Sequence, residues 1–262
     1  MAPPTSLHPT VRAAGAVSFL TDLSSEMIYP LLGHFITVTL GAGPIALGLV
    51  EGVADATASL VRLASGWWSD RYGSYRPLIL FGYGLSTLSR PLVALATAAW
   101  HVVALRFLDR VGKGIRGAPR DALIARVTGP ADRGRAFGFH RAMDHAGAVL
   151  GPLVASALIA AGAAERTVFG LALVPGLVCV AIIVAFVHDP EASPSAETAP
   201  EAPSVAGPRD PDETHAKPLP ETLKRYLVAA TLFGLGASSD AFLLLRAQEM
   251  GVALVHVPLL WS

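Results

Sequence analysis

The sequence predicts an all-α, polytopic membrane protein built as a helical bundle. The chain is 52% hydrophobic and only 15% charged, with a mean hydropathy of +0.51. Several apolar runs are long enough, at about 1.5 Å per residue, to cross a hydrocarbon core about 30 Å thick. An amphipathic helix of a soluble protein has a polar, charged face along its whole length, whereas here the charged residues are clustered. We therefore expect a multi-pass protein whose main partner is the lipid bilayer.

Six helices are expected before residue 188. Glycine, proline and charged residues interrupt the apolar runs, and such residues mark turns. The first apolar run after Arg12 is short and is followed by Thr21-Asp22 rather than by a small-residue cleavage site. We therefore expect an uncleaved first helix rather than a signal peptide. The approximate helix ranges are 11–40, 45–68, 78–98, 100–127, 136–161 and 167–187.

The composition divides the chain into three parts. Residues 189–221 are rich in proline, alanine and glutamate and contain no aromatic residue. Such a segment cannot bury a core, so we expect a disordered linker. It separates a six-helix bundle, residues 1–188, from residues 222–262, which begin a second bundle with a seventh helix at 223–245. The apolar segment 252–262 is too short to span a bilayer, so the chain is expected to be truncated in a partial eighth helix.

The distribution of lysine and arginine predicts the orientation in the membrane. Short links with an excess of these residues stay on the cytoplasmic side. The links after the second and fourth helices hold Arg71, Arg76, Arg133 and Arg135, whereas those after the first and third hold none. We therefore expect a cytoplasmic N-terminus, a cytoplasmic linker, and residence in a bacterial inner membrane.

The fourth expected helix contains an unusually charged stretch, residues 106–121, with five basic and two acidic residues in sixteen positions. If this stretch did not cross, residues 100–135 would form one external loop whose basic residues contradict the orientation rule. A charged residue at the bilayer centre costs about 2.5–3.5 kcal/mol on translocon scales. The charges must therefore face a water-filled cavity, pair with one another, or extend to the membrane surface. Three of them are expected to extend to the cytoplasmic surface: Arg116, Arg120 and Asp121.

Acidic residues on the first two helices form two i, i+4 pairs, Asp22 with Glu26 and Glu51 with Asp55. Like charges at that spacing repel, so each pair requires cationic partners or a bound proton. In one interpretation, the first and fourth helices line an aqueous path with carboxylates that carry protons and cations that hold an anionic group. In the other, the acidic residues neutralise Arg62, Arg90, Arg106 and Arg110. The candidates for the path are Asp22, Glu26, Arg106, Asp109, Arg110 and Lys113, of which Arg106, Arg110 and Lys113 share one helical stripe.

The link between the second and third helices resembles a signature of the major facilitator superfamily. It reads Gly66-Trp-Trp-Ser-Asp70-Arg71-Tyr-Gly73-Ser-Tyr-Arg76, and Ser74 stands where the family usually has its first basic residue. Gly66 permits close helix approach and Gly73 suits a tight turn. A carboxylate such as Asp70 can accept from a helix N-terminus or an arginine.

The fourth helix resembles a further motif of the same family. Arg106 is followed by Gly112 and Gly114, while Arg110 replaces an expected glycine. In the family, the arginine at the position of Arg106 is linked to proton coupling.

The fifth helix resembles the motif of the family's antiporters. The matching residues are Gly138, Gly147, Gly151 and Pro152, with Ala155 and Ser156 in place of a final glycine pair. Small residues at this spacing allow helices to pack closely, and proline can kink a helix.

The resemblance implies a half of the family's fold, in which two six-helix halves enclose a central solute site. It also implies a secondary active transporter, with proton-coupled antiport or efflux of a small solute by alternating access. The proton gradient would be the energy source, without a cofactor. The cations of the fourth helix favour an anionic or zwitterionic solute. Because one bundle supplies half of a cavity, a truncated, non-transporting remnant or helix-association module is the alternative, and a channel is a weaker third.

Other classes of function lack the residues that they need. The sequence shows no metal-ligand cluster, phosphate-binding glycine loop or arrangement around a nucleophile. It shows no basic patch interleaved with aromatic residues for nucleic acid. Its single cysteine, Cys179, cannot form a disulfide within one chain. We therefore expect no enzyme, metal or nucleic-acid site, and the sequence does not specify an oligomeric state.

Overall fold

In the computed structural model, residues 6–72, 74–189, 220–236 and 239–262 are described, and these residues form helices and turns. The chain divides into two compact units. One contains Met1–Asp189 together with Ser239–Ser262, and the other is Pro190–Ser238, whose described part is α9 (Glu221–Gly236). The expected linker, 189–221, lies almost entirely outside the described residues.

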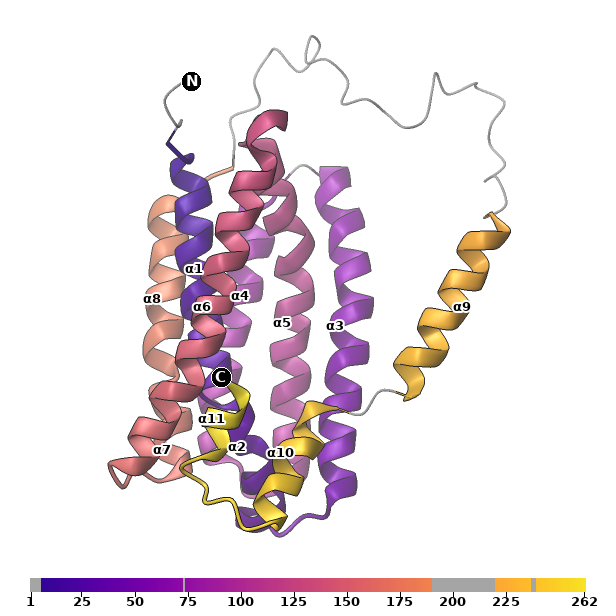
Figure 1. Cartoon of the computed structure of the whole chain (residues 1–262). Coiled ribbons are helices and arrows are strands. Elements are labelled where there is room, and N and C mark those ends of the chain that lie inside the picture. The colour runs from indigo at the N-terminus through magenta and orange to yellow at the C-terminus, as the bar shows by residue number, and fades with distance from the viewer. Residues whose placement is uncertain (1–5, 73, 190–219, 237–238) are drawn as a thin grey trace. The chain divides into compact units, whose positions relative to one another are not determined.

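The first unit contains the six expected helical runs (Figure 1). Several of them consist of more than one helix in the structure. In chain order the helices are α1 (Pro9–Glu26), α2 (Tyr29–His34), a π-helical turn (Phe35–Thr39), α3 (Pro44–Tyr72), α4 (Arg76–Leu92), α5 (Ala99–Arg126), α6 (Arg133–Ala160), α7 (Glu165–Leu171) and α8 (Leu173–Phe186).

Three runs that the sequence predicts as continuous are interrupted. The first changes direction after α1 and restarts at Tyr29-Pro30, and proline suits the first turn of a helix because its missing N–H needs no partner there. The third ends its α-helical part at Leu92, directly after Pro91, and continues as a 3-10 turn. The sixth is divided at Ala172, between α7 and α8.

Glycines set the close packing of the bundle. α5 packs between α3 and α4, while α1 packs against α6 and α8. A Cβ atom added at Gly82 of α4 would lie 2.6 Å from the carbonyl oxygen of Gly112 on α5. The two backbones therefore approach too closely for any side chain, as is typical where small residues face each other between membrane helices.

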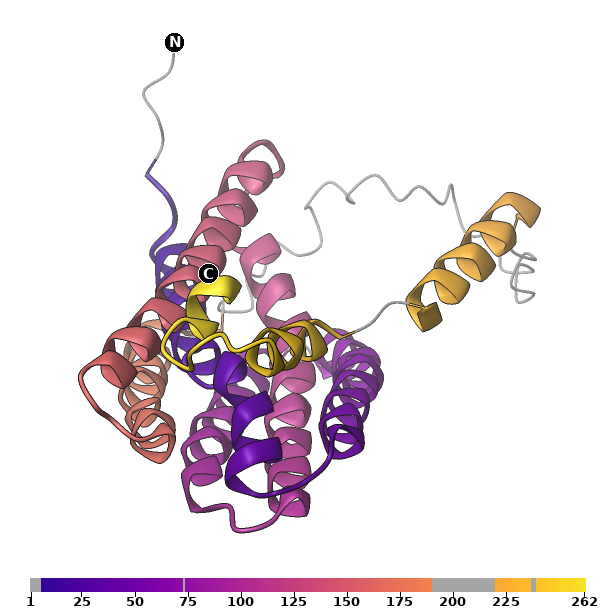
Figure 2. The same ribbon diagram turned by 60° about the horizontal axis from the view of Figure 1, so that its bottom comes forward.

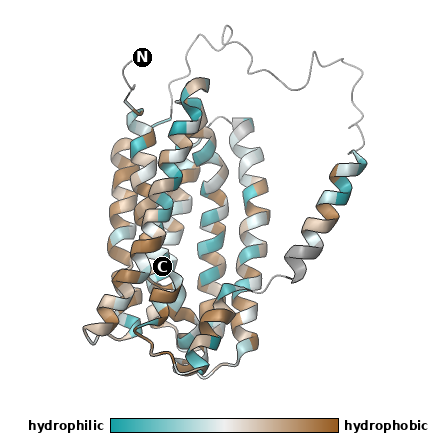
Figure 3. Cartoon of the chain, in the orientation of Figure 1, coloured by the Kyte–Doolittle hydropathy of each residue, from teal (hydrophilic) through white to brown (hydrophobic). Residues whose placement is uncertain are grey.

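Among the residues that the structure describes, four helical stretches are long and apolar enough to cross a bilayer, namely Pro44–Ser69, Arg76–Leu95, Pro130–Ala160 and Glu165–Phe186. α1 and α5 fall outside this set because each carries at least three charged residues. α5 nevertheless runs alongside α3 and α4, with hydrophilic residues spread along its length (Figure 3). The prediction that residues 106–121 form a helix of the bundle is confirmed.

The start of α1 and the end of α8 lie at the same end of the bundle, which we call the N-terminal end (Figure 1). Asp189 stabilises this end. Its Oδ1 accepts hydrogen bonds from the backbone N–H groups of Tyr75, at 3.1 Å, and Arg76, at 2.8 Å. A carboxylate at a helix N-terminus satisfies free N–H groups and complements the helix dipole. The start of α4 is thereby held to the residues that follow α8.

The predicted seventh helix at 223–245 is wrong as a single element. α9 ends at Gly236, and α10 (Asp240–Glu249) begins after Ser239, whose hydroxyl accepts from the backbone N–H of Ala241 as an N-cap. Within the expected eighth helix, only α11 (Val257–Trp261) is helical. α10 packs against α2, and α11 against α2 and α6, at the end opposite the N-terminal end (Figure 2).

Candidate functional site: a charged interior

Two arginines and two carboxylates form a balanced network between α3, α4 and α5. Arg106 Nη2 lies 3.1 Å from Glu51 Oε1, and Arg106 Nη1 lies 3.8 Å from Asp109 Oδ2. Arg90 Nε lies 2.9 Å from Asp109 Oδ1. All four side chains are buried. Two positive and two negative charges thus neutralise one another where an unpaired charge would be strongly destabilising.

The network reaches α1 and α2 as well. Arg90 Nη1 donates to the backbone carbonyl of Thr21 at 2.8 Å, and the guanidinium of Arg106 lies 5.5 Å from the centre of the Tyr29 ring. The pairing interpretation therefore accounts for Arg90 and Glu51. Arg106 and Asp109 are held by these contacts and are only 6% and 2% exposed. Their role in a solute path stays a prediction.

Arg116 and Arg120 do not extend to the membrane surface, so that prediction is wrong for both. Arg116 is only 4% exposed. It donates to Ser86 Oγ and to the carbonyl of Gly82, and its guanidinium lies 4.4 Å from the centre of the Tyr83 ring. Arg120 pairs with Asp121 at 2.9 Å, and only the Asp121 side chain is substantially exposed. Acceptors on α4 and α5 replace the surface water that the two arginines would otherwise require.

Arg110 and Lys113 differ from Arg106 although the three share a stripe. Within the described residues, neither forms a hydrogen bond or an ion pair within 4.0 Å. Arg110 is half-buried, with a buried Nε that lacks an acceptor, whereas Lys113 is exposed. The stripe thus separates into one neutralised cation and two that are available to a ligand.

Asp22 lies beside a carboxyl group that the sequence analysis did not select. Its side chain lies next to that of Asp144 on α6, with Lys113 and Glu26 in its electrostatic surroundings. Asp144 also accepts from Ser18 Oγ and pairs with Arg141 at 3.3 Å. Asp144 precedes Gly147 by one helical turn, on the face of α6 that meets α1. This spacing is the feature of the sequence that indicates a position near α1.

Glu26 has two hydrogen-bond donors. Its Oε1 accepts from Ser25 Oγ at 3.1 Å, and its Oε2 accepts from Nε1 of Trp261 at 2.7 Å. Trp261 was likewise not selected, because a tryptophan in an apolar segment is expected to pack against lipid or core. Its partner is 235 positions away in the sequence, and no local pattern reports such a contact.

The antiporter-like motif packs α6 against α1. A Cβ at Gly151 would lie 2.9 Å from the carbonyl of Leu23, and one at Gly147 would clash with the carbonyl of Phe19. Pro152 is buried beside them. Gly138 differs, because a Cβ there would meet no atom within 4 Å. Close packing therefore explains Gly147 and Gly151 but is the wrong explanation for Gly138.

The signature link is described only in part. A Cβ at Gly66 would lie 3.4 Å from that of Ala118, an ordinary contact between α3 and α5. The Arg71 guanidinium lies 5.9 Å from the Trp67 ring, and Arg76 Nη2 donates to the Val184 carbonyl at 2.9 Å. The side chain of Asp70 and the whole of Gly73 lie outside the described residues.

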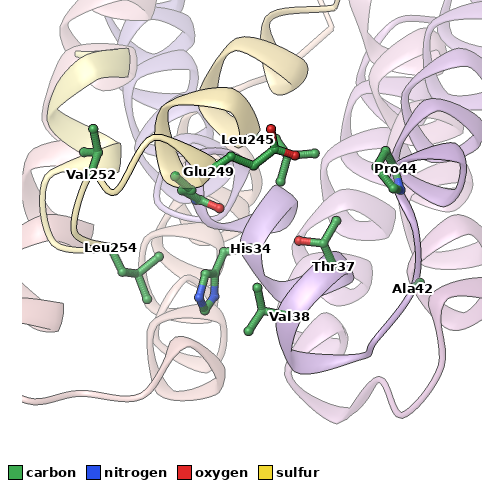
Figure 4. A pocket seen from close by; sticks show the side chains of 10 residues that line it. His34, Thr37, Val38, Ala42, Pro44, Leu245, Glu249, Val252 and Leu254 are labelled. Atoms are coloured by element: carbon green, nitrogen blue, oxygen red, sulfur yellow. The ribbon is translucent and has the colours of Figure 1, made fainter.

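A cavity of about 490 Å³ opens at the end opposite the N-terminal end, between the first helical run and α10 (Figure 4). His34 contributes to its wall and is held by Glu165, whose Oε1 lies 2.8 Å from the imidazole Nδ1. Within the described residues, no group of three or more histidine, cysteine or acidic side chains is arranged to hold a metal ion. The lining residues are His34, Thr37, Val38, Ala42, Pro44, Leu245, Gln248, Glu249, Val252 and Leu254.

The fold agrees with comparisons to known proteins. The family model described as Major Facilitator Superfamily matches residues 14–262. The chain belongs to the major facilitator superfamily. It is therefore a multi-pass membrane protein of a transporter family rather than an enzyme, as the motifs in its second, fourth and fifth helices predict.

Relatives of the chain include both archaeal and bacterial transporters. An MFS-type transporter of Methanocaldococcus jannaschii is 33% identical over 244 residues, which cover 93% of this chain and 58% of the relative. The multidrug resistance protein MdtH of Photorhabdus laumondii is 30% identical over 159 residues, which cover 59% of this chain and 39% of MdtH. The matched part of the chain thus spans little more than half of the first relative and less than half of the second.

Solved structures show the same fold at low sequence identity. A bacterial homologue of the human lysosomal transporter Spinster, in an inward-facing and unoccupied conformation, superposes with a TM-score of 0.67 at 16% identity. The match covers 95% of this chain and 57% of that one. A POT family transporter superposes with a TM-score of 0.62 at 14% identity, covering 94% and 48%.

Proposed function

We propose that this chain forms part of a proton-coupled exporter, which moves a small solute outward in exchange for protons by alternating access. The observation that carries the proposal is the position of Asp22. It forms no salt bridge with a described residue, and its carboxyl group lies next to that of Asp144. Two neighbouring carboxyl groups repel each other when both are charged, so the pair is suited to bind and release one shared proton.

The other acidic residues of the interior are less suited to this role. Glu51 and Asp109 are each within 4.0 Å of an arginine in the balanced network. A proton on either would leave a buried arginine unpaired, at a cost of about 3–5 kcal/mol. The coupling proton is therefore assigned to Asp22 and Asp144.

The proposed solute is anionic or zwitterionic. Arg110 and Lys113 are the cations of the α5 stripe that no described carboxylate pairs with, and Lys113 lies close enough to Asp22 to interact with it electrostatically. Export is supported by the relation to multidrug resistance proteins named MdtH.

The proposed orientation places the N-terminal end in the cytoplasm of a bacterial cell, whose inner membrane the protein spans. The start of α1 shares its end of the bundle with the links that contain Arg71, Arg76, Arg133 and Arg135 (Figure 1). Basic residues in short links favour the cytoplasmic side.

Reconstitution tests the proposed exchange. Proteoliposomes that contain the 262-residue chain are loaded with fluorescein, an anionic dye, or ethidium, a cationic dye, and given a pH gradient. We expect gradient-dependent efflux of fluorescein that Asp22→Asn abolishes and that Asp55→Asn, at an exposed acid one turn from Glu51, leaves unchanged. Fluxes of both dyes that ignore the gradient contradict proton coupling, and preferential ethidium flux contradicts the assignment of an anionic solute.

A further inference from the structure

The indole of Trp261 forms a contact between the C-terminal segment and the acidic residues of α1. A tryptophan N–H only donates, so the 2.7 Å contact fixes Oε2 of Glu26 as the acceptor, while Ser25 donates to Oε1 at 3.1 Å. A hydrogen bond to a carboxylate is stronger than one between neutral groups. The contact is therefore strongest when Glu26 carries its charge.

The same indole ring packs against Tyr29, the aromatic residue beside the buried network of arginines and carboxylates. The ring centres of Trp261 and Tyr29 are 4.9 Å apart. The guanidinium of Arg106 also lies near Tyr29, at 5.5 Å from the centre of its ring. One side chain of α11 thus touches both Glu26 and the aromatic residue that covers Arg106. Ser25, Arg106 and Asp109 line one small cavity beneath it.

The position of α11 depends on few other polar contacts. Ser156 Oγ of α6 donates to the backbone carbonyl of Val255, at 2.6 Å, just before α11 begins. Among the described residues, the Glu26–Trp261 contact is the side-chain hydrogen bond that joins α11 to α1.

We propose that Trp261 is a positioning residue that couples the charge of Glu26 to closure of the end opposite the N-terminal end. While Glu26 is charged, it holds the indole, and α11 covers this end beside α2 and α6. When Glu26 binds a proton, the charge-assisted bond is lost and α11 separates from α1. The inference rests on the proposed transport, to which it adds a second protonation event with a separate consequence.

Other charged groups surround the contact and need controls. Asp22 lies one turn earlier on α1, and its electrostatic surroundings include Glu26. His34, on α2 near α10, is paired with Glu165. The charged groups near the contact on the described helices include Asp22 on α1, Glu51 on α3, Arg90 on α4, Arg106 and Asp109 on α5, and Asp240 on α10.

Quenching of Trp261 fluorescence tests the inference without a solute. The chain has four tryptophans, so replacing Trp67, Trp68 and Trp100 by phenylalanine leaves Trp261 as the sole emitter in lipid nanodiscs. We expect protection from acrylamide at neutral pH and about a tenfold rise in the unprotected fraction on acidification, the size expected for loss of a charged hydrogen bond. Circular dichroism confirms that each variant retains its helices.

In the protein whose sole tryptophan is Trp261, Glu26→Gln should raise the fraction of Trp261 that acrylamide can quench at every pH. The neutral amide never forms the charge-assisted bond. Asp22→Asn and His34→Gln should keep the pH step. The inference is overturned if Glu26→Gln retains both the protection and the step, or if the parent shows no step at all. Because no flux is measured, these outcomes are independent of whether the chain exports fluorescein.

The role of the indole N–H itself is tested by Trp261→Phe, which keeps an aromatic ring against Tyr29. If Trp261 only packs, the pH profile of fluorescein efflux stays that of the parent. If it positions Glu26, efflux by the Trp261→Phe variant loses the part of its pH dependence that Glu26→Gln also removes. Trp100→Phe, at an exposed tryptophan, serves as the matched control and should leave the profile unchanged.

Discussion

Arg90 Nε and Asp109 Oδ1 lie 2.9 Å apart between α4 and α5, and the same carboxylate is 3.8 Å from Arg106. Asp109 is therefore the shared anion of two buried arginines. This geometry explains how a helix with so many charges packs in the interior of a membrane bundle, since its deepest charges are already neutralised within the protein.

Asp109→Asn should destabilise the bundle strongly. The substitution leaves Arg90 without its carboxylate and Arg106 with Glu51 alone, which corresponds to a loss of about 3–5 kcal/mol for a broken buried pair. Thermal unfolding in detergent should show a clear fall in the melting temperature, whereas the exposed Asp55→Asn should melt like the parent. Equal melting of the two variants would show that the network contributes little to stability.

Gly82→Ala should separate α4 from α5. The added Cβ would lie 2.6 Å from the Gly112 carbonyl and 2.8 Å from Arg116 Cβ, so overpacking is expected to cost about 1–3 kcal/mol. Gly84→Ala on the same helix meets nothing within 4 Å and is the matched control. Thermal unfolding of the two variants measures the difference, and a stable Gly82→Ala protein would contradict the close backbone contact.

Asp144→Asn should abolish proton-driven efflux while preserving the fold. The amide still accepts from Ser18 but cannot release the proton that it would share with Asp22. Flux of fluorescein under an imposed pH gradient should fall to the level of Asp22→Asn, and exchange without a gradient should persist. Retention of gradient dependence would assign the coupling proton to another group.

Lys113→Gln should weaken solute binding with little loss of stability. The exposed lysine forms no ion pair with a described residue, so its removal leaves no buried charge unpaired. We expect the KM for an anionic solute to rise about tenfold, the typical effect of losing one charged hydrogen bond, with an unchanged melting temperature. Arg106→Gln, by contrast, should lower the melting temperature because it leaves Glu51 unpaired.

The sequence predicted the bundle because each helix before residue 188 is bounded by glycine, proline or charged links and is apolar between them. The crossing of residues 106–121 followed from the orientation rule, despite their low hydropathy. The pairing of Glu51 with Arg106 was also among the predicted alternatives. These features depend on local composition, which a single sequence contains.

The errors have a common physical cause, which is that they depend on partners far away in the sequence. Arg116 stays buried because α4 offers the Gly82 carbonyl and Ser86, and no pattern within α5 reports these acceptors. The link between Asp22 and Asp144 depends on how α1 and α6 pack. The break between α9 and α10 is an exception, because its cause is local: Ser239 caps α10 by accepting from the backbone N–H of Ala241.

The division of α5 into a neutral part and a charged part has an electrical consequence. A membrane potential exerts no net force on the group formed by Arg90, Arg106, Glu51 and Asp109, because their charges sum to zero. Arg110 and Lys113 are not neutralised in this way, and moving one charge through a potential of about 100 mV changes its energy by about 2.3 kcal/mol. Any motion that carries α5 across the field is therefore sensitive to voltage through Arg110 and Lys113, and also through Arg116, whose partners are neutral groups.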